Sequence, residues 1–314
     1  MDKEILIRAQ HLYRYYGPHC AVHDVSFELA KGDVLGFLGP NGAGKSSTMQ
    51  MLTGNLAPSA GRVEIAGHDL LDEPRPARQS LGYLPEQPPL YRELTVDEYL
   101  GFCARLNRVP RRRTAEAVAR AKDRCGLGAV GRRLIGNLSK GYQQRVGIAQ
   151  AILHNPAVVI LDEPTVGLDP IQIREIRTLI RELGEDHGII LSTHILPEVQ
   201  GTCNRVQIIH QGRLVFADTM SGLESHLHAR QLILGLHNPP AIDELAGLPG
   251  ITNVECLDDH RFRLRFEGEN PAPAIAETAV VRRWGLEALI PERRTLEQIF
   301  VELTTQDLAA GEAA

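Results

Sequence analysis

The chain has 314 residues, of which 43% are hydrophobic and 23% are charged, and its formal net charge is -5. This length exceeds that of one typical compact unit and predicts two domains, while the composition is ordinary for a globular protein. The negative net charge argues weakly against a nucleic-acid-binding protein, because such proteins are usually basic. We therefore expect no nucleic acid among its partners.

The cysteines and the chain start indicate where the protein works. The five cysteines are scattered singly with no C-x-x-C pair. This spacing suits reduced thiols in a cytosolic protein and provides neither a disulfide framework nor a zinc site. The charged first residues lack the apolar core of a secretion signal, and no apolar stretch approaches the roughly twenty residues that cross a bilayer. If the protein serves a membrane process, we expect another chain to supply the membrane part.

The first part of the chain alternates strand-like and helix-like segments. Strands are predicted at residues 5–7, 22–29, 34–38, 62–65, 81–84, 158–161 and 189–191. Helices are predicted at residues 45–52, 95–106, 114–125 and 171–183, the last with Gly184 as its C-cap. The strands at 158–161 and 189–191 are continuous apolar runs, which is typical of a parallel sheet buried on both faces. The pattern predicts an α/β domain.

The pattern changes after about residue 220. Strands are predicted at residues 231–236, 254–257, 262–266 and 286–290, and helices at 240–246, 272–284 and 296–303. This β-α-β-β-α-β order predicts a ferredoxin-like α+β module over residues 229–305. Such a module usually packs or regulates, so we assign it no chemistry. Residues 306–314 are expected to form a disordered tail.

A phosphate-binding loop follows the strand at residues 34–38. It matches the pattern G-x-x-x-x-G-K-[ST] and consists of Gly39, Pro40, Asn41, Gly42, Ala43, Gly44, Lys45 and Ser46, with Ser47 next. The glycines let backbone N–H groups curl around a phosphate, and the following helix adds its N-terminal donors. Lys45 would reach the β- and γ-phosphates, and the Ser46 hydroxyl would coordinate Mg²⁺. The glycines lack the G-x-G-x-x-G spacing of a dinucleotide site. The loop predicts binding of a nucleoside triphosphate with magnesium.

Two acids stand at the end of another predicted strand. Asp162 and Glu163 follow the apolar run at 158–161, and ligands bind at such strand ends in open α/β sheets. Taken alone, the pair is more simply a solvated strand end. Downstream of a phosphate loop and followed by Pro164, Asp162 is predicted to hold Mg²⁺ through water, and Glu163 to polarise the attacking water as general base.

A third motif identifies a family resemblance. Residues 138–145 read Leu-Ser-Lys-Gly-Tyr-Gln-Gln-Arg, just before a helix. With the phosphate loop and the acidic strand end, this motif makes residues 4–220 resemble the nucleotide-binding subunits of ATP-binding cassette (ABC) transporters. It departs from the usual signature L-S-G-G-Q at Lys140 and Tyr142. The resemblance implies that Ser139 and Gly141 contact the γ-phosphate held by a second copy of the subunit.

The same resemblance implies a P-loop NTPase fold for residues 1–222, with a mixed sheet core and a small helical subdomain at about residues 88–137. It implies further that Asp169 belongs to the loop through which two copies sense one another. His194, after the strand at 189–191, resembles the switch histidine that contacts the γ-phosphate. Tyr16 is the expected stacking partner of adenine, with Tyr13 and Tyr15 as neighbours that could be core or surface.

The glutamine loop matches the family imperfectly. Glu86 stands where the family usually has Gln, and Gln87 follows it. Either side chain could reach magnesium and the attacking water, and we assign the role to Glu86 with Gln87 in reserve. Residues 88–95 follow. Three of them would form the small exposed apolar patch that receives a helix of the membrane subunit in this family, namely Leu90, Tyr91 and Leu94. A proline-stiffened loop packed on its own domain is an equal alternative.

The resemblance implies an ATPase that dimerises head to tail around two ATP molecules and moves a separate membrane permease from the cytoplasmic face of the inner membrane. Within the family, the chain looks most like the ATPases of ABC-2 type exporters. The alternative is a soluble cassette ATPase acting in translation or DNA maintenance, but such proteins usually carry two cassettes or a long coiled coil, and this chain has no sustained heptads. A third possibility is a binding module without turnover, but the presence of Glu163 and His194 argues against it. The transported substrate cannot be read from this chain.

Overall fold

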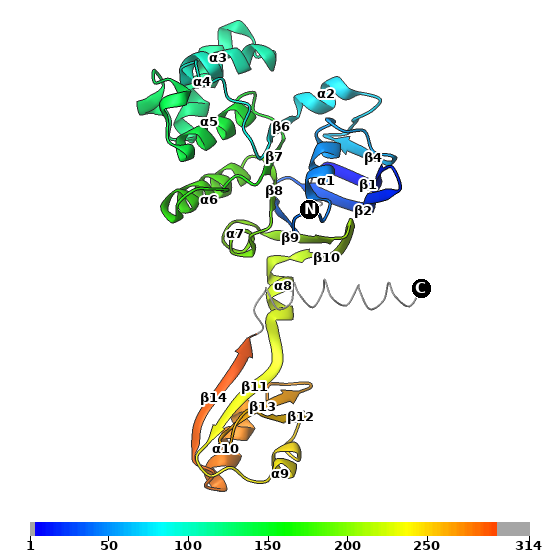
Figure 1. Ribbon diagram of the computed structural model, residues 1–314, viewed down its shortest axis with the longest axis vertical. Helices are drawn as coiled ribbons and strands as arrows, with labels where there is room; N and C mark the ends of the chain where they lie inside the picture. The colour runs from blue at the N-terminus through cyan, green and yellow to red at the C-terminus, as the bar shows by residue number, and fades with distance from the viewer. Residues whose placement is uncertain (1–3, 294–314) are drawn as a thin grey trace. The chain divides into compact units, whose positions relative to one another are not determined.

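The computed structural model describes residues 4–293, except for the side chains of residues 224–230 and 293. The chain divides into two compact units, Met1–Met220 and Ser221–Ala314, each with its own hydrophobic cluster (Figure 1). The predicted helix at residues 296–303 and the predicted tail at residues 306–314 lie outside the described residues.

The first unit is built on a six-stranded mixed sheet in the order β10-β9-β3-β8-β7-β6. Its strands are β3 (Val34–Leu38), β6 (Leu81–Leu84), β7 (Val158–Asp162), β8 (Gly188–Thr193), β9 (Arg205–His210) and β10 (Arg213–Thr219). The pairings are parallel except between β9 and β10. Every residue of β3, β7 and β8 is buried, as expected for parallel strands covered on both faces. The predicted α/β fold with a mixed sheet is confirmed.

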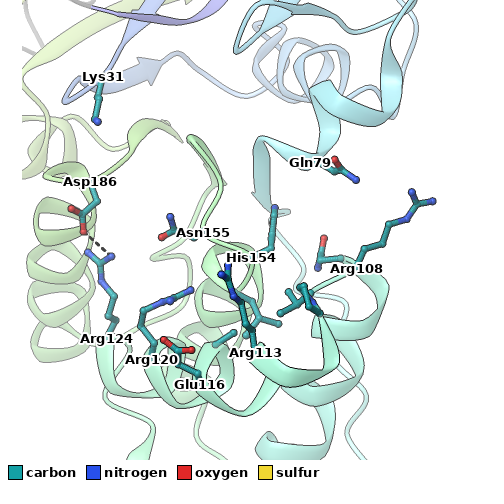
Figure 2. Close-up of a pocket in the computed structure, with 15 residues that line it drawn as sticks. Lys31, Gln79, Arg108, Arg113, Glu116, Arg120, Arg124, His154, Asn155 and Asp186 are labelled. Atoms are coloured by element: carbon teal, nitrogen blue, oxygen red, sulfur yellow. Dashed lines mark ion pairs between the residues drawn. The ribbon is translucent and has the colours of Figure 1, made fainter.

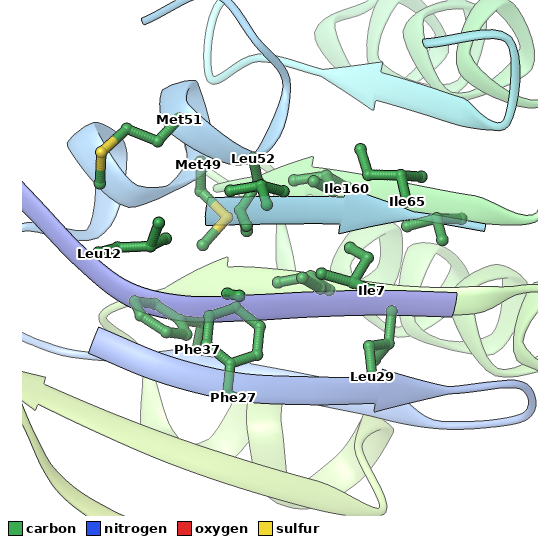
Figure 3. Close-up of a cluster of buried hydrophobic side chains, with 14 of the residues drawn as sticks. Ile7, Leu12, Phe27, Leu29, Phe37, Met49, Met51, Leu52, Ile65 and Ile160 are labelled. Atoms are coloured by element: carbon green, nitrogen blue, oxygen red, sulfur yellow. The ribbon is translucent and has the colours of Figure 1, made fainter. Parts of the chain in front are cut away.

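A second, antiparallel sheet covers the first. Its order is β2-β1-β4-β5, with β1 (Ile5–Tyr16), β2 (His19–Ala30), β4 (Ala60–Ile65) and β5 (His68–Asp69). Apolar side chains from this sheet, from the mixed sheet and from α1 (Lys45–Leu52) form one buried cluster, which Figure 3 shows. Phe27 of β2 and Phe37 of β3 have ring centroids 5.9 Å apart in it. This shared core fixes the start of α1, and with it the phosphate loop.

Three helices between β6 and β7 pack against one another: α3 (Val96–Leu106), α4 (Arg111–Arg124) and α5 (Lys140–Ile152). Figure 1 shows them grouped together. Two short 3₁₀ turns, η1 (Gly128–Val130) and η2 (Ile135–Asn137), connect α4 to α5. A capping box starts α3, because Thr95 accepts a hydrogen bond from the backbone N–H of Glu98 and the Glu98 carboxylate accepts one from that of Thr95.

The other helices of the first unit are α2 (Pro74–Gln79), α6 (Pro170–Gly184) and α7 (Leu196–Thr202), and α8 (Met220–Leu227) begins at the last residue of this unit. The expected C-cap at Gly184 is wrong, because α6 includes this glycine and the cap is Glu185. Gly184 serves close packing instead, since a Cβ there would lie 2.5 Å from Val34 Cγ2. None of the described helices is both long enough and apolar enough to cross a membrane.

The second unit has a four-stranded antiparallel sheet in the order β12-β13-β11-β14. Its elements are β11 (His228–Leu236), α9 (Ile242–Ala246), β12 (Ile251–Cys256), β13 (Arg261–Phe266), α10 (Ala272–Val281) and β14 (Leu286–Arg293). The element order is the expected β-α-β-β-α-β, and the strand order is that of the split βαβ arrangement. The helix expected at 272–284 ends three residues earlier, and Trp284 is buried beyond it.

Candidate functional site

The phosphate loop lies between β3 and α1, at the carboxyl end of a central strand. Gly44 is the N-cap of α1 with φ at 105°, and Gly42 has φ at 80°, both in the left-handed region. A Cβ at Gly44 would lie 2.6 Å from the carbonyl oxygen of Ala21, so only glycine fits there. The resulting turn leaves the first backbone N–H groups of α1 available to an anion.

The two glycines provide a matched test of this loop geometry. Gly44→Ala is expected to lower the free energy of unfolding by about 1–3 kcal/mol more than Gly42→Ala does, because a Cβ at Gly42 meets nothing within 4 Å. Both substitutions share the cost of a positive φ, so their difference isolates the contact with Ala21. Thermal unfolding of the two variants measures it, and equal midpoints would contradict the loop geometry.

Lys45 is buried at the base of this loop. Its Nζ donates hydrogen bonds to the carbonyl oxygens of Gly39 at 2.8 Å and Pro40 at 3.2 Å. It also lies 3.8 Å from Glu163 Oε1. Burial lowers the pKa of the Lys45 ammonium, while nearby carboxylates, Glu163 foremost, oppose this shift. The loop therefore holds a desolvated cation directly beside an acid.

Glu163 is buried, with 7% of its surface exposed, and several contacts hold it in place. Its backbone N–H donates to Ser192 O at 2.8 Å, and its φ of 48° is uncommon for a residue other than glycine. His194 Nδ1 lies 2.9 Å and 3.0 Å from the two Glu163 carboxylate oxygens. Strained backbone of this kind clusters at functional sites. The carboxylate is thus held between a histidine and the lysine of the phosphate loop.

Asp162, the last residue of β7, has an unsatisfied oxygen. Its Oδ1 atom is buried and makes no hydrogen bond with any residue that the structure describes. Burial raises the pKa of this carboxyl group. A bound cation would relieve both costs, so Asp162 fits a metal ligand. No cluster of three or more acidic, histidine or cysteine ligands occurs within residues 4–293. Mg²⁺ usually takes one or two carboxylates together with substrate phosphates, so the Asp162 carboxylate suits that ion.

One pocket of about 400 Å³ brings the motifs together. Its lining residues are Ala21, Asn41, Gly42, Gly44, Lys45, Ser46, Ser47, Glu86, Glu163, Val166 and His194. The two candidates at the glutamine position differ in one respect: both side chains are exposed, but Glu86 lines the pocket and Gln87 does not. Ala21 and Val166 were not predicted. No sequence signal marks them, since small and aliphatic residues of this kind occur throughout the core.

The signature residues and Asp169 do not line this pocket. Ser139 is the N-cap of α5 and accepts a hydrogen bond from Tyr142 N at 3.4 Å. Asp169 is the N-cap of α6 and accepts hydrogen bonds from two backbone N–H groups at 3.0 Å and 2.9 Å. The two helix starts are neighbours, since a Cβ at Gly141 would lie 2.7 Å from the Gln172 side chain of α6. Within one copy, both residues act as helix caps.

Tyr16 ends β1 beside the phosphate loop. Its ring is 45% exposed, and its hydroxyl lies 3.4 Å from Ser47 Oγ. The Arg14 guanidinium stands over the same ring, 4.8 Å from the centroid. Tyr13 and Tyr15 come earlier in the same strand, and their rings are stacked with centroids 6.5 Å apart. Tyr16 is therefore the tyrosine of the three that contacts the loop.

The expected patch at residues 88–95 is only partly exposed. Tyr91 is 47% exposed, and one side of its ring packs on α3, 6.0 Å from the Tyr99 ring and 5.6 Å from the Phe102 ring. Leu90 and Leu94 are half-buried. A groove of about 640 Å³ lies beside this segment and is lined by Tyr83, Pro85 and Pro89, among others. The segment thus combines local packing with one exposed ring.

A larger cavity of about 880 Å³ lies away from these motifs (Figure 2). Its cationic lining residues are Lys31, Arg108, Arg113, Arg120 and Arg124. Arg124 pairs with Asp186 at 2.9 Å. None of the residues predicted for the nucleotide site lines this cavity. Size alone therefore does not locate the nucleotide site.

Comparisons with known proteins agree with these motifs. The family model described as ABC transporter matches residues 22–166. The bacitracin transport ATP-binding protein BcrA of Bacillus licheniformis is 37% identical over 212 residues, which cover 67% of this chain and 68% of that protein. The linearmycin resistance ATP-binding protein LnrL of Bacillus subtilis (strain 168) is 29% identical over 311 residues, which cover 96% of this chain and 99% of that protein.

A solved structure with the same fold is that of an ATP-binding subunit of an ABC transporter. It is 32% identical, has a TM-score of 0.64, and is matched over 70% of this chain and 92% of its own length. A phosphate loop, an acidic strand end and His194 meet around one pocket, and together with these relatives they lead to one assignment. The chain belongs to the ABC transporter family and is an ATP-binding subunit of such a transporter.

Proposed function

We propose that two copies of this chain bind and hydrolyse ATP with Mg²⁺ to drive a separate permease that exports its substrate. ABC ATP-binding domains are ATPases coupled to transport and work with transmembrane components. The export direction is supported by the relatives, one named for bacitracin transport and one for linearmycin resistance. The chain would act at the cytoplasmic face of the membrane, held there by the permease.

The observation that carries this proposal is the buried Glu163 carboxylate between His194 and Lys45. A general base must lie close to the water that it activates, and this carboxylate opens into the same pocket as the phosphate loop. His194 holds the carboxylate and would sense the γ-phosphate. Lys45 would bind the β- and γ-phosphates while balancing the charge of Glu163.

Magnesium would be held by the Ser46 hydroxyl and, through water, by Asp162, with phosphate oxygens among its other ligands. The buried, unpartnered Oδ1 of Asp162 supports this role. When bound, the ion neutralises charge that develops on the transferred phosphoryl group. Tyr16 would stack on adenine, its ring being exposed beside Ser47.

The proposed dimer is supported by three predicted site residues that do not line the pocket. Ser139, Gly141 and Asp169 stand at the starts of α5 and α6, and none of them lines the pocket of their own copy. A helix N-terminus favours an anion. We propose that the start of α5 meets the γ-phosphate bound by a second copy, so that each ATP lies between two copies.

Phosphate release by the purified chain, alone and with its permease, tests the proposed function. We expect Mg²⁺-dependent release from ATP and co-purification with a multi-span membrane protein. If the complex binds ATP but releases no phosphate, the chain is a regulatory module without turnover, and the proposal is contradicted.

The departure at the glutamine position provides a separate prediction. Glu86→Ala is expected to lower permease-coupled ATP turnover about tenfold, because this side chain lines the pocket and can reach the metal and the water. Gln87→Ala is the matched control, and we expect its turnover to stay within about twofold of wild type, since its side chain does not line the pocket. A loss in Gln87→Ala only would show that Gln87 has the role, and no loss in either variant would show that neither side chain has it.

A further inference from the structure

A buried acid close to the proposed site has no role in the chemistry described so far. Glu198 lies in α7 and is 1% exposed. Its carboxyl group pairs with no cation among the residues that the structure describes. Burying such a group costs free energy unless other contacts compensate. Its position therefore calls for an explanation.

Two threonines supply the contacts of this carboxyl group. The Thr165 hydroxyl donates a hydrogen bond to Glu198 Oε1, and the Thr193 hydroxyl donates one to Oε2 at 2.9 Å. Both threonines are buried. Thr165 lies in the loop that leads from Glu163 to Asp169, whereas Thr193 ends β8 directly before His194. Glu198 thus ties together the two segments that carry the proposed base and the switch histidine.

Two carboxylate groups, those of Glu198 and Glu163, are possible acceptors for the Thr193 hydroxyl. Its oxygen lies 2.9 Å from Glu198 Oε2 but 3.4 Å from Glu163 Oε2. A hydroxyl has only one proton to donate, and the shorter contact is the stronger hydrogen bond. The same oxygen accepts a hydrogen bond from Ile195 N at 3.1 Å, which fixes its position. Glu198 therefore draws the Thr193 proton away from Glu163.

We infer that Glu198 is a positioning residue for ATP hydrolysis: by accepting the shorter hydrogen bond from the Thr193 hydroxyl, it leaves Glu163 with only the long, weak contact to that donor. A hydrogen bond donated to a carboxylate stabilises its charged form and weakens it as a base. Without Glu198, the Thr193 hydroxyl would turn to Glu163. This inference rests on the proposed function, because it takes Glu163 as the base.

The test uses the full chain and separates turnover from binding. Glu198→Met removes both acceptors at similar volume, and we expect it to lower kcat about tenfold while KM and the affinity for ATP change by less than about twofold. Glu198→Gln keeps one acceptor and should retain an intermediate kcat. Glu185→Met, the same change at an exposed glutamate, is the control and should leave kcat unaltered.

A second substitution distinguishes positioning from general damage. Thr193→Val removes the hydroxyl that would turn to Glu163, so the double variant Glu198→Met/Thr193→Val should recover kcat to within about threefold of Thr193→Val alone. A double variant as slow as Glu198→Met would overturn the inference, as would an unchanged kcat in Glu198→Met or an equal loss of kcat and affinity. If Glu198→Met does not fold, Glu198→Gln with and without Thr193→Val provides the same comparison.

The outcomes also separate this inference from the proposed function. If the wild-type chain hydrolyses ATP, Glu163→Gln does not, and Glu198→Met is as fast as wild type, only the role of Glu198 is contradicted. Full hydrolysis by Glu163→Gln would contradict the proposed function itself.

Discussion

Glu163→Gln is expected to lower ATP turnover by about 10²- to 10⁴-fold, because an amide cannot accept the proton of the attacking water. Binding should be retained or strengthened, since the substitution removes a negative charge that lies 3.8 Å from Lys45 and close to the bound phosphates. The amide oxygen can still accept a hydrogen bond from His194, so the pocket should keep its shape. Phosphate release measures turnover, and titration with a fluorescent ATP analogue measures affinity.

The control is Glu116→Gln, the same change in the larger cavity of Figure 2. It should leave turnover unaltered, because that cavity contains none of the residues proposed for hydrolysis. Turnover by Glu163→Gln within about threefold of wild type would remove Glu163 from the role of base.

The second large effect is expected at the phosphate loop. Lys45→Ala should weaken ATP binding by about 30-fold to several thousand-fold, because losing one partner of a buried charge pair costs about 2–5 kcal/mol. The lysine is 6% exposed, so water cannot replace its ammonium group easily. Equilibrium binding of ATP without magnesium isolates this contribution from that of the metal.

Lys31→Ala provides the matched control, because Lys31 is exposed and lines the larger cavity. Its affinity for ATP should equal that of wild type. Thermal unfolding of both variants checks that the fold is intact. Unaltered ATP affinity in a folded Lys45→Ala protein would show that the phosphates bind elsewhere.

Much of the fold and several site residues are readable from the sequence, because local signals determine them. The buried strands β3, β7 and β8 are uniformly apolar, and the glycines of the phosphate loop mark the turn into α1. Asp162 and Glu163 stand at the end of an apolar run. Signals of this kind depend on neighbouring residues in the chain, so one sequence suffices to detect them.

Other features depend on contacts between distant segments and cannot be predicted in this way. Glu86 and Gln87 are adjacent in the sequence, and only the tertiary structure brings one of them into the pocket. Glu198 is an ordinary acid in a helix until Thr165 and Thr193 are seen to donate to it. Gly184 has the sequence features of a C-cap, yet the close approach of Val34 explains it better.

The proposed pairing of half-sites is tested most directly by a structure of the Glu163→Gln protein with Mg²⁺ and ATP. We predict a dimer in which the Ser139 hydroxyl of one copy lies within hydrogen-bonding distance, about 3.5 Å or less, of the γ-phosphate bound by Lys45 of the other copy. An ATP enclosed by a single copy, with Ser139 far from any terminal phosphoryl group, would contradict it.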